Sequence, residues 1–403
     1  MINECDAKGL RVIWDVVIVG AGPAGASAAL GALTQQPGAR VLMLDRAPIG
    51  RDKSCGDGIA PHAIDTLRAI GGPTTFPGHP PIPTLELRNG ARGVTRQMRR
   101  PALVVPRARF DAAIATSALE AGAELMKCQV RAVEQRKGVV LINGEIAART
   151  LIAADGAHST VRRLASEQPA GGQPVARGRV AMALRGYAPT PPGRAGRQVI
   201  EFGQSRQPSY AWSFDRGDGW ANIGYGEVVH RGRRRVPLSK APLSKTLMIE
   251  QIEAMLPGST AGAEQWLGHH LPLSARHFTH PSGPILYAGD AASLINPLTG
   301  EGIYYAIATG AIAGVCAARE GVSTAASRIY RSAVRRLLGP HLATTATVAR
   351  AVEIPGVLDA GLRAAKAEQG AFDDLVEMGL GRGMLTTRLA AGLVTESVHR
   401  QGI

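Results

Sequence analysis

The stretch WDVVIVGAGPAGASAALGALTQQPGARVLMLDR, residues 14–46, constrains the fold more than any other part of the chain. It reads as an apolar strand, a tight turn, an Ala-rich helix and a second strand, which together form a βαβ unit. Gly20, Gly22 and Gly25 give the turn the pattern GxGxxG. The first glycine permits the turn, the second lets the backbone approach a pyrophosphate, and the third lets helix and strand pack closely. The helix N-terminus then faces the phosphates with the positive end of its dipole.

An acidic residue follows this turn at the spacing of a dinucleotide site. Asp45 lies 20 residues after Gly25, at the end of the second strand, where its carboxylate can accept hydrogen bonds from the hydroxyls of an adenosine ribose. Arg46 follows as a further candidate contact. GxGxxG alone also suits a purely structural turn, but the flanking strands, the helix and the placed acid make the signal strong. NAD and FAD share an ADP half, so this unit by itself leaves both cofactors open.

Length and cysteine content exclude several other classes. A chain of 403 residues can bury a large core and suits one large α/β unit or two closely joined domains. The four cysteines are widely spaced, with no CxxC pair and no Cys/His cluster at metal-ligand spacing, so we expect neither a metal site nor a disulfide framework. The first residues lack the apolar stretch of a signal peptide, and no long apolar run follows. These features predict a cytoplasmic protein, at most peripheral to a membrane.

The net charge of +14 comes from arginine in local runs. The runs are RGRRR (231–235), MRR (98–100) and SAVRRLL (332–338). Each could be an ordinary solvated face or a patch for an anionic partner. We expect no nucleic-acid binding, because aromatic residues are only 4% and are not interleaved with the basic runs. An anionic lipid surface or a diphosphate ester fits better.

Two later segments decide between the cofactors. LIAADGAHSTVRRL (151–164) and GPILYAGDAASLINPLTGEGIYYAIATG (283–310) resemble the two further flavin motifs of the aromatic-hydroxylase type of FAD fold. The resemblance implies that Asp290 meets the ribityl and pyrophosphate region and that backbone N–H groups at 300–303 face the pyrimidine edge of the flavin. A helix N-terminus there would stabilise the negative charge of a reduced flavin. The implied FAD contacts are Arg107, Asp155, Gly156, Asp290, Gly300, Gly302 and Ile303.

These motifs predict an α/β fold: a Rossmann-like FAD-binding domain of the aromatic-hydroxylase type, an interleaved α+β substrate domain and a helical C-terminal region. Short strands at RVAMALRGY, RQVIEF, SYAWSF and WANIGYG suit a sheet over the flavin, and the chain becomes helical from residue 323, with breaks at Pro355 and at GLGRGM. The predicted FAD-binding parts are 1–80, 107–170 and 276–322, the substrate-domain parts are 81–106 and 171–275, and the helical region is 323–403.

Three segments narrow the resemblance to one family. RDKSCGDGIAPHAIDTLRAIG, YAWSFDRGDGWANIGYG and GDAASLINPLTGEGIYYAIATG look like the geranylgeranyl reductase family of FAD-dependent oxidoreductases, and most like its actinobacterial members that saturate a menaquinone side chain. The family usually has proline before the cysteine and after YxWxF; this chain has Ser54 and Asp215 there. The resemblance implies an FAD-dependent reductase of a double bond in an isoprenoid chain, such as a prenyl diphosphate, a prenylated quinone or a lipid.

In that reaction, hydride reaches one carbon of an unactivated alkene and the other carbon must collect a proton. Cys55 is the candidate proton donor or relay, because the loop that carries it should run back toward the flavin. Tyr210, Trp212 and Tyr304 are the candidate substrate-lining residues. Cys55 could instead be a small packing residue, and Tyr210 and Trp212 could be ordinary core residues of a strand.

Two other functions stay open at this point. The same fold could react reduced flavin with oxygen and serve as a monooxygenase that epoxidises or hydroxylates a prenylated small molecule. The protein could also be a flavin-bound carrier or regulator without turnover, a function that leaves Cys55 without a chemical role. The chain has no second GxGxxG, so NADPH, if it is the electron donor, would dock transiently without a domain of its own.

Overall fold

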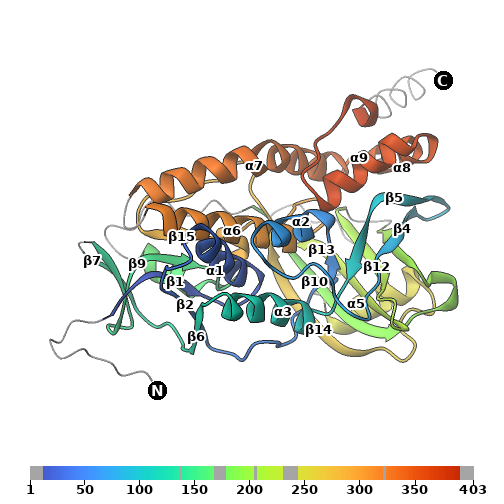
Figure 1. Ribbon diagram of the computed structural model, residues 1–403. Helices are drawn as coiled ribbons and strands as arrows, with labels where there is room; N and C mark the ends of the chain where they lie inside the picture. Colours follow the sequence, from blue (N-terminus) through green and yellow to red (C-terminus); the bar gives the residue numbers. More distant parts are fainter. Residues whose placement is uncertain are drawn as a thin grey trace.

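The computed structural model describes residues 12–136, 138–167, 178–203, 207–229, 244–320 and 324–390 (Figure 1). In this part of the chain the first sheet holds seven strands in the order β6-β2-β1-β9-β8-β7, with β15 also pairing with β9. The strands β1, β2, β6, β9 and β15 run parallel, while β7 and β8 form an antiparallel edge. Their bounds are β1 (Ile13–Val19), β2 (Val41–Asp45), β6 (Glu124–Lys127), β7 (Val133–Arg136), β8 (Val139–Ile142), β9 (Ile146–Ala153) and β15 (Ile285–Tyr287).

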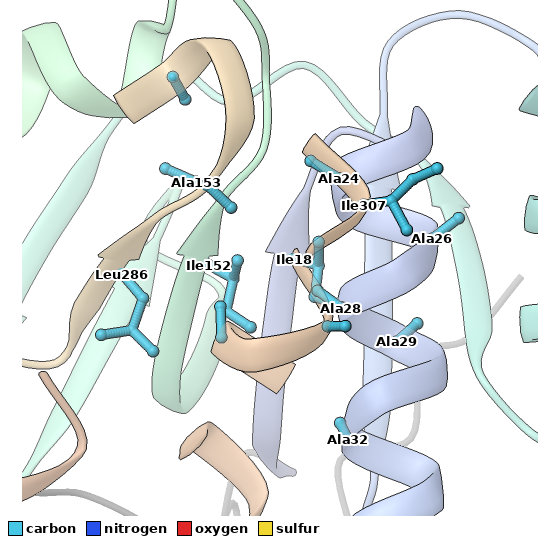
Figure 2. Close-up of a cluster of buried hydrophobic side chains, with 14 of the residues drawn as sticks. Ile18, Ala24, Ala26, Ala28, Ala29, Ala32, Ile152, Ala153, Leu286 and Ile307 are labelled. Atoms are coloured by element: carbon cyan, nitrogen blue, oxygen red, sulfur yellow. The ribbon is translucent and has the colours of Figure 1, made fainter. Parts of the chain in front are cut away.

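Two helices pack on this sheet at unusually short range. Helix α1 (Pro23–Gln35) and helix α6 (Ile303–Glu320) lie against each other because glycines remove the side chains between them. A Cβ on Gly310 would lie 2.1 Å from the carbonyl oxygen of Ala24, and one on Gly314 would lie 1.9 Å from that of Ala28. Figure 2 shows the alanine-rich face of α1 with Ile307 of α6 beside it. Both helices run in the same direction, so both N-termini point to the same end of the sheet.

The second sheet follows the order β14-β10-β13-β12-β11-β4-β5-β3. It is mostly antiparallel, although β4 and β11 pair in parallel. The strands predicted between residues 178 and 275 are confirmed and lie next to one another in this sheet. The bounds are β3 (Gly58–Ile59), β4 (Ile82–Asn89), β5 (Arg92–Val104), β10 (Val180–Pro189), β11 (Arg197–Phe202), β12 (Ser209–Asp215), β13 (Trp220–Val229) and β14 (Glu264–Pro272).

Helices from distant parts of the sequence cover the second sheet. Helix α5 (Lys245–Met255) buries Met248 and Ile252 against strands β10 to β13. The C-terminal helices α8 (Val357–Ala367) and α9 (Gln369–Leu380) pack on β4 and β5 (Figure 1). The remaining helices are α2 (Pro61–Ala69), α3 (Arg107–Glu120), α4 (Thr160–Ser166), α7 (Thr324–Ala351) and the short 3-10 turns η1 (Pro192–Arg194) and η2 (Gly289–Ala292).

The chain passes repeatedly between the two sheets. It builds the βαβ unit, crosses to β4 and β5, returns for α3 and β6 to β9, crosses again for β10 to β14, and returns at β15. The break predicted at Pro355 separates α7 from α8, where Gly356 has φ +90°, and α9 ends at the GLGRGM turn. The predicted fold class is therefore confirmed. The predicted domain limits stay predictions.

Candidate active site

One large cavity runs from the glycine turn of the first sheet to the C-terminal helices. Its volume is about 790 Å³. One end is lined by Gly20, Gly22, Asp45 and Arg46, and the other by apolar side chains of the second sheet and of helices α8 and α9. The predicted site residues on its wall are Gly20, Gly22, Asp45, Arg46, Cys55, Arg107, Asp155, Gly156, Tyr210, Trp212, Asp290, Gly300, Gly302 and Ile303.

The glycine turn leaves open space where a pyrophosphate would lie. Gly20 has φ +101°, and a Cβ on Gly25 would lie 1.7 Å from the carbonyl oxygen of Gly20, so both positions require glycine. A Cβ on Gly22 would enter the cavity and come within 2.7 Å of Lys53 Nζ. Asp45 Oδ2 accepts a hydrogen bond of 2.8 Å from the backbone N–H of Ala21, which orients the carboxyl beside the turn. This cradle fits the ADP half of a dinucleotide.

Two cations face this cradle and share one carboxylate. Arg107, at the start of α3, forms two hydrogen bonds to Asp111 of 2.7 and 2.8 Å, and Lys53 Nζ lies 3.2 Å from Asp111 Oδ2. Although burial opposes ionisation, Arg107 and Lys53 hold the pKa of Asp111 below its ordinary value. Burial lowers the pKa of Lys53, and Asp111 acts against that effect. Two cations balanced by one carboxylate leave a net positive charge for phosphate.

The second and third motifs meet beside this cradle. Asp155 accepts hydrogen bonds from Ser159 Oγ (2.6 Å) and from the N–H of Val161, so its carboxylate caps the start of α4. Arg162 ties the two motifs together by donating to the carbonyl oxygens of Ala157 and Ala291. Burial raises the pKa of Asp290, which lines the cavity. Hydroxyl donors, such as those of a ribityl chain, would suit its carboxyl.

The N-terminus of α6 carries a carboxyl group that the sequence analysis did not single out. Glu301 stands between Gly300 and Gly302, and its Oε1 accepts a hydrogen bond of 2.8 Å from the N–H of Tyr304. Its carboxylate also interacts with the N–H of Ile303, so it contacts the backbone donors predicted to face the flavin. Burial raises the pKa of Glu301 to about 7. The signal was present in the sequence, as a carboxyl between two glycines at a helix start.

The loop that carries Cys55 is anchored to the second sheet. Asn222 Nδ2 donates a hydrogen bond of 2.8 Å to the carbonyl oxygen of Cys55, and Ser54 Oγ donates one of 2.9 Å to that of Leu267. These contacts present Cys55 to the cavity. Burial raises the pKa of the thiol to about 11, while Arg107 acts in the opposite direction. The thiol therefore keeps its proton at neutral pH.

An aromatic row on β12 forms part of the cavity wall. Tyr210, Trp212 and Phe214 alternate along β12, so they share one face. The rings of Tyr210 and Trp212 are 5.8 Å apart, and all three residues line the cavity. The Trp212 ring lies over Gly224 of the neighbouring strand, where a Cβ would come within 2.2 Å of it. The absence of a side chain at Gly224 thus leaves the space that the Trp212 indole occupies.

The position of Tyr304 differs from the predicted one, which was on the cavity wall. Among the described residues, the cavity wall includes neither Tyr304 nor Tyr305. The Tyr304 ring packs 5.6 Å from the ring of His62, and the Tyr305 hydroxyl bonds to His341. Both side chains are buried in the core. Tyr304 is therefore a packing residue here and not a lining residue.

Beyond the aromatic row the cavity continues as an apolar channel. Strands β4 and β11 supply one wall and helices α8 and α9 supply the other. The channel-lining residues include Leu85, Leu87, Ile200, Phe202, Leu358, Leu362, Leu375 and Val376. Sequence reasoning did not assign the C-terminal helices to this wall, since their apolar spacing resembles that of any packed helix.

Asp215 lies apart from the cavity. Its carboxylate accepts hydrogen bonds from Thr190 Oγ1 (2.9 Å) and from the N–H groups of Gly196 and Gly217, which fixes the turns at the end of the sheet. The aspartate that stands where the family usually has proline is thus held by local hydrogen bonds. Ser54, which replaces the other usual proline, lines the cavity.

The arginine runs have different surroundings. RGRRR lies outside the described residues. In MRR, Met98 is buried, Arg99 is exposed and Arg100 bonds to Asp65 at 2.7 Å. In α7, Arg335 donates to the carbonyl oxygen of Phe278, and Arg336 is exposed. None of the helices in the described segments combines the length and the apolar character needed to span a bilayer.

Comparisons with known proteins identify the class. Residues 14–314 match the FAD binding domain family. Together with the glycine cradle and its cations, this match defines an FAD-dependent oxidoreductase.

Relatives narrow the class further. The chain is 32% identical over 359 residues to a menaquinone reductase of Mycolicibacterium smegmatis, covering 83% of both chains. It is 32% identical over 335 residues to digeranylgeranylglycerophospholipid reductase 1 of Methanopyrus kandleri, covering 79% of this chain and 84% of that one. A geranylgeranyl bacteriochlorophyll reductase-like protein from Thermoplasma acidophilum shares the fold, with a TM-score of 0.74 at 20% identity over 97% of this chain and 100% of that one. The chain belongs to the geranylgeranyl reductase family of FAD-dependent oxidoreductases.

Proposed function

We propose that this protein saturates a double bond in an isoprenoid chain, as an FAD-dependent reductase. One observation carries the proposal: a single cavity joins the dinucleotide cradle to an apolar channel, and Cys55 lies on its wall with Tyr210 and Trp212. A linear hydrocarbon chain suits such a channel, because burying its apolar surface is favourable along the whole length. The names of the relatives, a menaquinone reductase and a digeranylgeranylglycerophospholipid reductase, support a prenylated substrate.

Several residues suit the binding of FAD. Gly20, Gly22 and Gly25 with Lys53 and Arg107 suit the pyrophosphate, and Asp45 with Arg46 suits the adenosine ribose. Asp155, Gly156 and Asp290 suit the ribityl region. The turn made by Gly300, Gly302 and Ile303 suits the flavin ring.

When bound and reduced, FAD supplies the hydride for one alkene carbon. The protein's own task is to supply the proton for the other carbon and to exclude water from the channel. Cys55 suits the first task, because its thiol stays protonated at neutral pH and lines the cavity. The bulky aromatic rings of Tyr210 and Trp212 suit the second task, the exclusion of water. Their electron-rich faces would also stabilise positive charge that develops on the alkene.

The reductase proposal competes with one alternative, a monooxygenase acting on a prenylated small molecule. The thiol loop favours reduction, because oxygen transfer requires no proton on a substrate carbon. Product mass after anaerobic and aerobic incubation with prenylated quinones and prenyl diphosphates distinguishes the two. A gain of two hydrogens supports reduction, and a gain of one oxygen overturns it in favour of oxygenation.

We also propose NADPH as the electron donor, docking transiently, since the sequence holds a single GxGxxG. Anaerobic mixing with NADPH should bleach the flavin absorbance.

A peripheral contact with anionic membrane is the third part of the proposal. Val352 and Leu385 line the channel. Ile354, two residues after Val352, is 60% exposed, and Met384, directly before Leu385, is 51% exposed. Arg350 and Arg382, also exposed, flank these positions. Exposed apolar side chains with arginine nearby suit the interface of an anionic bilayer, from which a lipid substrate could enter the channel.

A further inference from the structure

A buried carboxyl lies two residues beyond Cys55, and the chemistry described above does not use it. Asp57 is 0% exposed and has a left-handed backbone, with φ 58°. Its Oδ2 accepts a hydrogen bond of 2.6 Å from the hydroxyl of Tyr187, whereas Oδ1 is buried and makes no hydrogen bond of ordinary geometry. A buried carboxyl that is only partly satisfied costs free energy. Backbone strain at the same residue adds to that cost, so packing alone does not explain Asp57.

The pair formed by Asp57 and Tyr187 connects two cavities. On one side, the backbone N–H of Asp57 contacts the sulfur of Cys55, which lines the main cavity. On the other side, Tyr187 lines a second cavity of about 420 Å³, together with Asp52 and Arg216. One hydrogen bond, from Tyr187 to Asp57, therefore joins the wall of the second cavity to the loop that carries the thiol.

Charged groups act on the Cys55 thiol from several elements. Burial is the largest influence and raises its pKa to about 11. Arg107 of α3 lowers this pKa, whereas the carboxylates of Asp57 and of Glu301, before α6, raise it. Tyr210 of β12 is the other titratable group that faces the thiol. Asp57 is thus the acidic group on the thiol's own loop that disfavours the thiolate.

The Asp57 carboxyl titrates close to neutrality. Burial raises its pKa to about 6, while hydrogen bonding by Tyr187 and the amide of Asn222, and the charges of Arg185 and Arg107, act in the opposite direction. This carboxyl holds a proton more tightly than an exposed aspartate does, yet releases one far more readily than the thiol. Its carboxylic acid is therefore strong enough to reprotonate a Cys55 thiolate.

We propose that Asp57 is a positioning residue that keeps Cys55 protonated and, with Tyr187, returns a proton to it after each transfer to substrate. The second half of this inference rests on the proposed function. When Cys55 gives its proton to a substrate carbon, a thiolate is left; the carboxylic acid of Asp57 reprotonates it, and the second cavity lets Asp57 regain a proton from water. This step is a proton transfer, and no group is oxidised or reduced.

The test measures Cys55 without requiring turnover. Iodoacetamide alkylation of Cys55 is followed against pH by peptide mass spectrometry in wild type, Asp57→Asn and Tyr187→Phe. Asparagine tolerates left-handed backbone, and phenylalanine keeps the ring that lies 4.2 Å from Arg185 and 4.8 Å from Arg216. Asp215→Asn is the matched control, since Asp215 is also buried but lies apart from the cavity.

Asp57→Asn should shift the midpoint of the alkylation profile downward by about one pH unit, because a nearby like charge is removed. Tyr187→Phe should leave this midpoint unchanged, because Asp57 stays ionised at the high pH where the thiol titrates. It should instead raise the pH of the lower inflection in the alkylation rate, which reports ionisation of Asp57, since loss of the hydroxyl disfavours the charged carboxylate. Asp215→Asn should leave the midpoint unchanged. An unchanged midpoint in Asp57→Asn would overturn the inference, and so would an unchanged lower inflection in Tyr187→Phe. Faster alkylation at every pH with the same midpoint would also overturn it, because that result indicates only a loosened loop. If Asp57→Asn shows the midpoint shift but the wild-type protein never reduces an alkene, the proposed function alone would be overturned.

Discussion

The two ends of the main cavity are built in different ways. At the dinucleotide end, one continuous βαβ unit supplies Gly20, Gly22 and Asp45, and local backbone geometry forces the choice of residue. At the channel end, strands β4 and β11 face helices α8 and α9, which come from segments more than 150 residues apart. The first end depends on backbone conformations that only certain residues adopt. The second depends on volume and apolar surface, which many residues provide.

This difference predicts different kinds of mutational effect. Changes at the cradle should abolish cofactor binding outright, whereas changes along the channel should alter which substrate is accepted. Cys55 lies between the two ends, so its loss should remove chemistry and leave both kinds of binding intact.

The largest effect is expected at Gly22. Gly22→Val should lose nearly all bound flavin, because a side chain there would occupy the cavity beside Lys53, where the pyrophosphate belongs. Flavin absorbance per folded chain after gel filtration measures this. Gly38→Val is the matched control, since Gly38 lies in the same βαβ unit and a Cβ added there would have no atom within 4 Å. Full flavin content in folded Gly22→Val would show that the cofactor does not use this turn.

The next effect concerns the thiol. Cys55→Ala should keep FAD and the folded state but lose most alkene reduction, and Cys55→Ser should lose much of it, because a hydroxyl is a weaker acid of similar size. Reduction of the flavin by the electron donor should survive in both variants, since that half-reaction needs no proton delivered to carbon.

Cys128→Ala is the matched control, because it removes a different thiol from the wall of the same cavity. Cys128 also lines the wall, but beside the dinucleotide cradle, so activity per bound flavin should be retained. Near-normal product formation by Cys55→Ala would remove the proposed role and bring the oxygenase alternative forward.

The same contrast explains what could be predicted from the sequence. The fold class and the cradle were predictable, because Gly20 and Gly25 each satisfy a local steric requirement that leaves a short motif. Lys53 was missed because a lone charged residue in a loop resembles any solvated residue until its neighbours are known. Glu301 had a signal, its place between two glycines at a helix start, but the groups that its carboxyl contacts depend on the fold. The place of Tyr304 at a helix start predicts that it lines the cavity, but which side of α6 faces the cavity depends on how the helix packs, and the Tyr304 ring lies against His62 instead. The channel wall from α8 and α9 depends on contacts between distant segments that no local pattern records.

A smaller effect is expected in the channel. Leu358→Trp should leave flavin content unchanged and raise KM for long prenyl chains several-fold more than for short ones, because the larger ring fills space on the α8 wall. Steady-state kinetics with a series of chain lengths measures the difference. Leu125→Trp, on the exposed edge strand β6, should change neither value. Equal KM changes for short and long chains would mean that the chain does not occupy this channel.

The smallest effect is expected at the membrane surface, where each contact is exposed and salt screens the charges. Ile354 and Met384 are exposed apolar residues close in sequence to channel-lining positions, so they should insert into the interface while Arg350 and Arg382 meet anionic headgroups. Replacing Ile354 and Met384 by serine should reduce co-sedimentation with anionic vesicles a few-fold, whereas Leu125→Ser should not. Binding of wild type should fall as salt rises and should be weaker on neutral vesicles, because screening acts on the arginines but hardly on the apolar contacts. Equal binding to both vesicle types, unaffected by salt, would assign these arginines to an ordinary solvated surface, and the channel would then receive its substrate from solution.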